Sequence, residues 1–177
     1  MISHSHIQES VSRLAGVNLN RGNGQDYLPA IRSPVLTGAG ACGAFVMAED
    51  GIPLRAAGFC NINELFEAHS EVAQRIEVLR GPGTVLYGSN AIHGVFNDIT
   101  PGFGGQERLD IELGDNHYQR LKLIAATENL SLATSLTHDG GYRDLSGFDQ
   151  QKLSLKYRHQ TDTLSITTGI TGTNLNQ

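Results

Sequence analysis

Residues 76–100 constrain the fold of this chain more than any other segment of its sequence. An apolar alternation at Ile76 and Val78 stops at the break Gly81-Pro82-Gly83. A segment of helical length follows, and a second β-rich run covers residues 95–100. Period-two alternation is typical of half-buried strands, and glycine and proline mark tight turns. The segment therefore predicts a strand, a tight turn, one or two helical turns and a second strand.

The residues upstream predict a short helix and then a polar region. Ile7, Val11 and Leu14 share one helical face, and Gly16 is suited to stop the helix at its C-terminus. Residues 18–44 are polar and are interpreted as rich in loops.

Residues 45–72 predict a hairpin followed by a second helix. Two short strands are expected around Asp50-Gly51, because this pair readily supplies the positive φ of a tight turn. Asn61 is a candidate N-cap with Glu64 three positions later. The helix that follows would present one apolar face, made of Ile62, Leu65, Phe66, His69 and Val72.

Five consecutive segments after residue 105 alternate with period two and predict strands. Their alternating positions are Leu109, Ile111 and Leu113; Leu121, Leu123 and Ala125; Leu130, Leu132, Thr134 and Leu136; Leu153, Leu155 and Tyr157; and Leu164, Ile166, Thr168 and Ile170. The connections at 127–129 and 160–162 are tight, whereas 139–150 is long and rich in Gly and Asp. Short turns on one side and longer loops on the other suit an outer-membrane barrel. A soluble β-sandwich gives the same alternation, and the pattern alone favours the sandwich.

Composition and motifs exclude several classes of function. The net charge is −5 and the 13 Lys and Arg are scattered, which argues against a nucleic-acid interface. The chain has no G-x-x-x-x-G-K-[ST] phosphate loop, no G-x-S-x-G elbow and no H-E-x-x-H metal motif. His4 and His6 are interpreted as part of a frayed terminus. The sequence therefore predicts no catalytic residues, no metal site and no cofactor, and an enzyme is disfavoured.

The residues 76–100 also resemble a known family signature. The run Ile76-Glu77-Val78-Leu79-Arg80-Gly81-Pro82, with Leu86-Tyr87-Gly88 and the strand 95–100, resembles the plug domain of TonB-dependent outer-membrane receptors. Ala30-Ile31-Arg32 resembles a further strand of that domain, and 46–54 resembles its hairpin. Departures from the family pattern occur at Ser33-Pro34, His93 and Asp98. The resemblance covers nearly the whole chain.

The resemblance implies an α+β plug domain, a small mixed sheet with short helices, followed by an antiparallel β-meander that starts a transmembrane β-barrel. The expected domains are an N-terminally incomplete plug at 1–101, a linker at 102–105, and about five C-terminally truncated barrel strands at 106–177. Met1 to His6 has neither a basic nor an apolar signal region, so the resemblance implies that a beginning is missing.

The implied function is active uptake of a scarce ligand, such as an iron-siderophore, haem or cobalamin, with the plug as gate. The implied partners are the energy-coupling protein TonB, reached through a segment missing from this chain, a small-molecule or metal-chelate ligand, and outer-membrane lipid. The expected location is the cell outer membrane of a Gram-negative bacterium. The rival interpretation is a soluble β-rich binding or adhesion module.

The resemblance also implies roles for individual residues. The signature residues are Glu77, Arg80, Gly81, Pro82, Tyr87 and Gly88. Arg75, Glu77 and Arg80 are expected to pair with carboxylates on the inner barrel wall. The ligand-facing apex of the plug is expected to contain Arg32, Arg55, Phe59 and Asn61.

Cys42 and Cys60 are expected to form a disulfide, because an even, low cysteine count in an oxidising compartment suggests a structural bridge. Closing a loop of this length would stabilise the fold by roughly 3 kcal/mol in the chain-entropy model. Two buried free thiols are the alternative.

Overall fold

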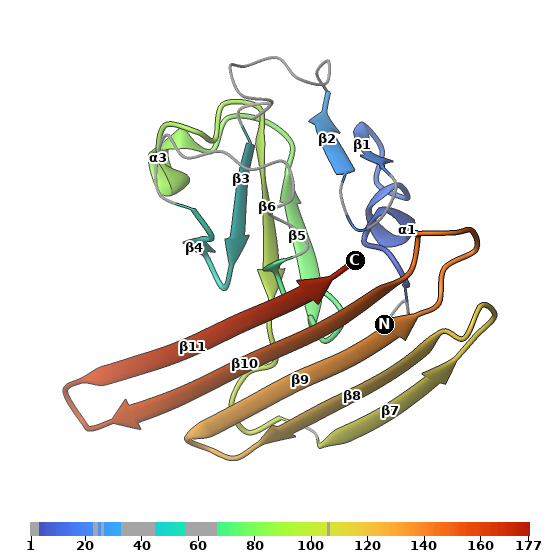
Figure 1. Cartoon of the computed structure of the whole chain (residues 1–177). Coiled ribbons are helices and arrows are strands. Elements are labelled where there is room, and N and C mark those ends of the chain that lie inside the picture. The colour runs from blue at the N-terminus through green and yellow to red at the C-terminus, as the bar shows by residue number, and fades with distance from the viewer. Residues whose placement is uncertain (1–3, 23–24, 26, 33–44, 56–66, 106) are drawn as a thin grey trace. The chain divides into compact units, whose positions relative to one another are not determined.

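The computed structural model describes residues 4–22, 25, 27–32, 45–55, 67–105 and 107–177. The chain divides into two compact units, Met1–Ile99 and Thr100–Gln177, called unit 1 and unit 2 below. Unit 1 contains α1 (Gln8–Val11), β1 (Val17–Arg21), β2 (Tyr27–Ile31), β3 (Phe45–Glu49), β4 (Ile52–Pro53), β5 (Arg75–Leu79), α3 (Thr84–Tyr87) and β6 (Gly94–Ile99). Unit 2 contains β7 (Arg108–Leu113), β8 (Gln119–Ala126), β9 (Leu130–Asp139), β10 (Phe148–Gln160) and β11 (Ser165–Asn176) (Figure 1).

The centre of unit 1 is a four-stranded mixed sheet in the order β4-β3-β6-β5. β3 and β6 are parallel, and the other pairs are antiparallel. One apolar cluster contains Phe45, Met47 and Phe96, and a second contains Val46 and Val95. Neighbouring residues of a strand point to opposite faces, so both faces of this sheet carry buried apolar side chains. The predicted mixed sheet with short helices is confirmed.

The β3–β4 turn confirms the predicted hairpin. Asp50 and Gly51 have φ values of 51° and 82°. Two positive φ values are what a two-residue hairpin of this hand requires. The turn is tied to β6, because the Asp50 backbone N–H donates to the Asp98 carbonyl (2.8 Å) and the Gly51 N–H donates to Asn97 Oδ1 (2.8 Å).

The N-terminal part of unit 1 corrects two predictions. The helix is one turn long, and Leu14 lies beyond it and is exposed, whereas Ile7 and Val11 are buried as expected. Residues 17–31 do not form only loop, because β1 and β2 pair as an antiparallel ribbon. The ribbon forms because Leu19, Tyr27 and Ile31 are almost completely buried in the main apolar cluster. The polar residues between them interrupt the apolar pattern, so the sequence did not predict the ribbon. The second predicted helix lies mostly outside the described residues, and its described end corrects the prediction. His69 and Val72 are buried, but residues 69–72 form a turn and not a helix, with the Val72 N–H donating to the His69 carbonyl at 3.3 Å.

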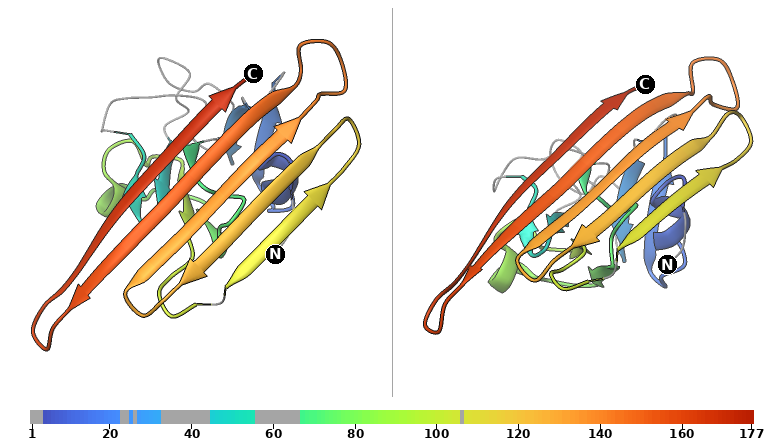
Figure 2. Two further views of the ribbon diagram at one scale, coloured as in Figure 1. Left: turned by 60° about the horizontal axis from the view of Figure 1, so that its bottom comes forward. Right: turned by 90° about the horizontal axis from the view of Figure 1, so that it is seen from below.

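Unit 2 is a five-stranded antiparallel meander in the order β11-β10-β9-β8-β7. All five predicted strands are present, and each pairs with its neighbours in sequence (Figure 2). The β10–β11 pairing continues past Tyr157, the partner of the first β9 residue, to Gln160 opposite Ser165. No helix in the described ranges is long and apolar enough to cross a membrane.

Candidate functional site

One corner of unit 1, where β2 and β5 end and β6 begins, carries Arg32 and Arg80. Arg75 lies at the other end of β5, opposite Ile99. Gly94, the first residue of β6, makes the close approach at this corner possible. A Cβ atom at Gly94 would lie 2.5 Å from Ile31 Cδ1 and 2.6 Å from the Leu79 carbonyl oxygen. Both distances are shorter than real Cβ contacts, so the end of β2 packs against the mixed sheet where β5 ends and β6 begins. We call this point the strand-end corner.

Two arginines follow directly from the strand-end corner. Arg32 comes after Ile31 and Arg80 comes after Leu79. The Arg80 Nη1 donates a hydrogen bond to the Ala15 carbonyl at 2.7 Å. The Arg32 backbone N–H donates to the Gly16 carbonyl at 2.9 Å, and its Cγ lies 3.1 Å from where a Gly16 Cβ would be. Both arginines therefore contact the turn between α1 and β1.

The backbone at this corner is held in conformations that favour glycine. Arg32 has a φ of 50° and Gly16 a φ of 76°. A left-handed backbone is uncommon for a residue with a side chain, and such strain persists only where its surroundings fix it.

No carboxylate of the described residues pairs with Arg32 or Arg80. The corner therefore presents two cationic side chains whose charges lack a described counter-charge.

The signature loop after Arg80 depends on glycines. Gly81 and Gly88 have φ values of 155° and 85°, so a residue with a side chain would be strained at either position. A Cβ at Gly83 would lie 2.8 Å from Val95 Cγ2. Tyr87, at the end of α3, packs on the second apolar cluster of the sheet. The other two apolar residues of α3, Val85 and Leu86, are almost fully exposed.

Arg75 and Glu77 pair with each other along β5. The Arg75 Nε lies 2.7 Å from Glu77 Oε1, and Asn97 Nδ2 donates to Glu77 Oε2 at 3.4 Å. The hydrogen bond from Arg75 is the main reason that the pKa of the Glu77 carboxyl lies below its usual value. Both side chains are about half exposed. The pairing of these residues with a barrel wall stays a prediction.

The remaining predicted residues fall into two groups. Arg55 is half-buried and forms an ion pair with Glu67. Phe59 and Asn61 of the proposed ligand-facing apex, and both cysteines of the proposed disulfide, Cys42 and Cys60, lie outside the described residues.

His4 and His6 were missed by the sequence interpretation, which treated them as a frayed terminus. Both are buried. His4 Nδ1 lies 2.9 Å from Ser10 Oγ, and its Nε2 lies 3.4 Å from Ser70 Oγ. His6 Nε2 lies 3.4 Å from the Gln25 carbonyl. The two imidazoles therefore tie residues 4–6 to the rest of unit 1, through contacts with residues that are distant in the sequence.

Burial has a consequence for the charge of His6. Its ring packs edge-on against Tyr27, with centroids 5.8 Å apart. Burial is the main cause that lowers the pKa of His6 from 6.5 to about 4, and the nearby charge of Arg21 adds to it. His6 is therefore neutral near pH 7. Within the described ranges, no group of three or more His, Cys, Asp or Glu side chains is arranged to hold a metal ion.

Unit 2 separates its charged and apolar side chains between the two faces of the sheet. On one face Glu112 lies 3.5 Å from Arg120 and also pairs with Lys122, and Arg120 Nε donates to Thr137 Oγ1 at 2.9 Å. The other face carries exposed leucines and isoleucines, with Leu109, Ile111 and Leu113 63%, 70% and 78% exposed. The faces alternate residue by residue along each strand, as a pleated sheet requires.

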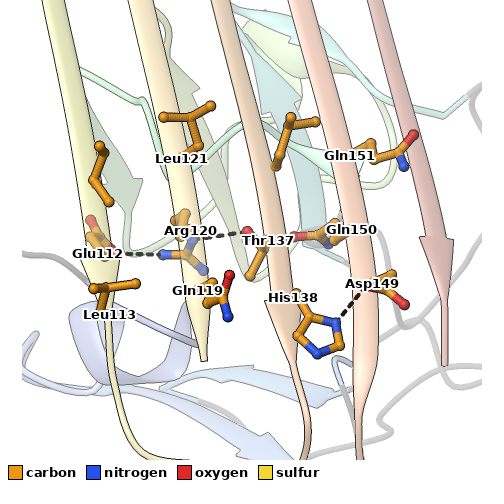
Figure 3. Close-up of a pocket in the computed structure, with 12 residues that line it drawn as sticks. Glu112, Leu113, Gln119, Arg120, Leu121, Thr137, His138, Asp149, Gln150 and Gln151 are labelled. Carbon is orange, nitrogen blue, oxygen red and sulfur yellow. Dashed lines mark hydrogen bonds and ion pairs between the residues drawn. The ribbon is translucent and has the colours of Figure 1, made fainter. Parts of the chain in front are cut away.

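A hollow of about 360 Å³ lies where the apolar face meets polar residues. Its wall contains Leu113, Leu121 and the pair of His138 and Asp149, whose Nδ1 and Oδ1 atoms are 2.7 Å apart (Figure 3). None of the residues predicted to be functional lines this hollow. It lies at the polar edge of the apolar face.

Known proteins share both units. Two solved receptors match this chain in fold. The ferric yersiniabactin uptake receptor FyuA from Yersinia pestis matches with a TM-score of 0.60 and 20% identity, over 92% of this chain and 27% of its own. The copper transporter OprC matches with a TM-score of 0.63 and 18% identity, over 90% of this chain and 27% of its own. The chain thus spans about a quarter of the length of these receptors, and its meander matches the start of a receptor barrel.

The family model described as TonB-dependent Receptor Plug Domain matches residues 3–95, which is more than half of the chain. The matched range contains the strand-end corner, the signature loop and the strands β3, β4 and β5 of the mixed sheet, and it ends within β6. The chain therefore belongs to the TonB-dependent receptor family, a family of non-enzymatic transporters.

Proposed function

We propose that this chain forms the plug and the first five barrel strands of a receptor that takes up a scarce ligand across the outer membrane of a Gram-negative bacterium, using energy delivered by TonB. The ligand class is an iron-siderophore, haem, cobalamin or a similar metal chelate. Family membership and the fold likeness to receptors named for ferric yersiniabactin and copper support this proposal.

The single observation that carries the proposal is the reversed polarity of unit 2. Leucine and isoleucine side chains cover the exposed face of the sheet, while Glu112 on the opposite face pairs with both Arg120 and Lys122. A soluble sheet packs its apolar face inward and turns its charged face to water. The strands of an outer-membrane barrel do the opposite, because hydrocarbon surrounds them and the lumen is polar.

The rival class, a soluble binding or adhesion module, would have to leave this apolar face in water. Exposed apolar patches of this kind on soluble proteins mark interaction surfaces or aggregation liabilities. The face extends over all five strands, from Leu109 on β7 to Ile170 on β11. A lipid surface satisfies every one of these side chains at once, so the receptor interpretation requires no further partner.

The strand-end corner supports two roles at neighbouring residues. Arg80, with Arg75 and Glu77, is proposed to pair with carboxylates of the barrel wall, and Arg32 is proposed to face the ligand together with Arg55, Phe59 and Asn61. Arg32 and Arg80 contact adjacent residues of the same turn, Gly16 and Ala15. This adjacency offers a physical route by which ligand binding could loosen the plug.

Membrane fractionation tests the proposal with a matched pair of variants in the full-length receptor. Ile170 and Thr171 are consecutive on β11 and point to opposite faces of the sheet. Ile170→Arg should reduce the amount of receptor in the outer-membrane fraction, because a cation on the lipid face costs roughly 2–4 kcal/mol near the membrane centre. Thr171→Arg should fractionate like the wild type.

Ligand uptake is tested separately. Disruption of the gene should abolish growth on a medium in which one metal chelate is the sole source of that metal. The wild-type gene should restore growth. Equal behaviour of Ile170→Arg and Thr171→Arg, with both proteins soluble, would support the adhesion module. Normal fractionation without any uptake phenotype would retain the membrane location and refute the transport role.

A further inference from the structure

The segment Thr100–Gly105, at the start of unit 2, is bound to β9, to β10 and to the turn between β8 and β9. Its glycine-rich sequence is that of a flexible linker. At its start, Lys156 Nζ on β10 donates a hydrogen bond to Thr100 Oγ1 at 2.6 Å. Next to it, Ser131 Oγ on β9 donates to the Pro101 carbonyl at 2.9 Å. We call this segment the strap.

The far end of the strap is bound to the turn between β8 and β9. The Gly104 N–H donates to the Thr127 carbonyl at 2.7 Å. Gly104 has a φ of 66°, a conformation that glycine adopts without strain, and this lets the chain turn toward β8. The strap is thus held at both ends by backbone or charged hydrogen bonds.

Arg158 on β10 joins the strap to the same turn. Its guanidinium lies over the Phe103 ring, 4.6 Å from the centroid. Its Nη2 donates to the Glu128 carbonyl at 2.6 Å, and its backbone N–H donates to the Asn129 carbonyl at 2.8 Å. One side chain therefore stacks on the strap while it holds the turn that the strap binds. A planar guanidinium serves both roles, whereas a lysine ammonium has neither the flat face nor the fork.

We propose that the strap is a mechanical stop, with Arg158 as its clamp. Rearrangement or unravelling of unit 1 then ends at Thr100 and leaves the strap and the meander intact. The inference goes beyond the proposed uptake function, because it concerns only contacts within residues 100–177 and holds for any ligand. Its consequence for a receptor is that a plug can be displaced without loosening the first strands of its barrel.

Hydrogen exchange on the full chain in detergent micelles tests the clamp. In the wild type, the Gly104 amide should exchange slowly, like the paired amides of β9. In Arg158→Ala, exchange at Gly104 should become about tenfold faster or more, because both the ring contact and the charged hydrogen bond are lost. Arg143→Ala is the matched control, since Arg143 also stacks on an aromatic ring, that of Tyr142, but on the β9–β10 loop.

A second variant covers the case in which Arg158→Ala disturbs the sheet itself. Phe103→Ala removes only the ring and should also speed exchange in the strap, with no change at the β9–β10 pair of Leu132 and Leu155. The proposal is overturned if Gly104 exchanges fast in the wild type, or if both variants leave its exchange unchanged. It is also overturned if Arg143→Ala loosens the strap as much as Arg158→Ala does.

Single-molecule pulling from both chain ends tests the stop directly. Unit 1 should unravel first and the extension should pause with the strap still bound. In Arg158→Ala the pause should occur about 20 Å later, the length of six extended residues. A wild-type pause that already includes the strap, or no pause at all, would contradict the proposal.

Discussion

Units 1 and 2 use the same apolar residue types in opposite ways. In unit 1 the largest apolar side chains, such as Leu19, Tyr27 and Phe96, are shielded almost completely and form the core. In unit 2 the regularly spaced leucines and isoleucines stand on the exposed face. Unit 1 therefore supplies its own apolar environment, whereas unit 2 is built to receive one from outside. A period-two pattern by itself does not distinguish these cases. It assigns the side chains to two faces of a sheet, but it does not say whether protein or lipid covers the apolar face.

The largest difference between the units should appear in water. The full 177-residue chain, expressed alone, should be insoluble or oligomeric, because the apolar face of unit 2 and the free edges of β7 and β11 can recruit other chains. Detergent micelles should disperse it. Light scattering with and without detergent measures the size of the particles. A monodisperse monomer in plain buffer would show that the apolar face of unit 2 needs no cover, as the core of unit 1 needs none.

A matched pair of leucine truncations should separate the units next. Leu19→Ala should lower the free energy of unfolding by about 2–5 kcal/mol, because Leu19 is fully buried. Leu113→Ala should cost clearly less, because Leu113 lies on the exposed face and the surrounding detergent fills the space that its side chain leaves. Chemical denaturation in micelles checks both. Equal costs at the two positions would mean that both units have cores of the same kind.

The burial of His6 gives unit 1 a pH dependence. The pKa of His6 is lowered to about 4 from 6.5, so the unfolded chain binds a proton more readily than the folded one between these values. The stability of unit 1 should therefore fall as the pH drops from about 6.5 to about 4, by at most about 3 kcal/mol. His6→Gln removes the titrating group. The free energy of unfolding of this variant should therefore fall less steeply than that of the wild type as the pH drops through this range. An unchanged slope in that variant would refute the assignment.

The close approach at the strand-end corner predicts a smaller effect. Gly94→Ala should destabilise unit 1 by about 1–3 kcal/mol, because the new methyl group would overlap Ile31 and the Leu79 carbonyl. Gly102→Ala is the control in the strap of unit 2, where a Cβ meets nothing within 4 Å. Thermal denaturation of the two variants gives the difference. A neutral Gly94→Ala would show that β2 and β5 do not meet there.

The smallest expected effect concerns Arg80. Arg80→Ala should cost about 0.5–1.5 kcal/mol in the free energy of unfolding of unit 1, through loss of the hydrogen bond to the Ala15 carbonyl. Arg13→Ala, on the surface nearby, serves as the control. In the full-length receptor the loss at Arg80 should be larger if Arg80 also pairs with the barrel wall. An equal loss in chain and receptor would argue against that pairing.

Local signals in the sequence were enough for most of the fold. The Asp50-Gly51 turn, the strands on either side of the signature loop and the five strands of unit 2 all follow from turn chemistry and period-two alternation, and all are present. The family resemblance rested on the residue identities in the motif at 76–100. The period-two alternation of unit 2 alone favoured a β-sandwich. Short elements with a strong local pattern are predicted well from the sequence, because their own residues determine their secondary structure.

Features that depend on distant contacts were not readable. The β1–β2 ribbon is fixed by burial of Leu19 and Tyr27, and the histidines near the start of the chain by contacts with Ser70 and Gln25. The convergence of Arg32 and Arg80 depends on a close approach between Ile31 and Gly94, which are far apart in the sequence. The strap has the composition of a linker, and only its partners on β9 and β10 show how it is held.

The central claim is that the exposed face of unit 2 meets lipid while the opposite face does not. A spin-label scan along β9 of the full-length receptor in membranes tests it most directly. Oxygen accessibility should oscillate with period two, with maxima at Leu132, Thr134 and Leu136 and minima at Ser131, Ala133 and Ser135. A flat profile, or maxima at the second set of residues, would contradict the account.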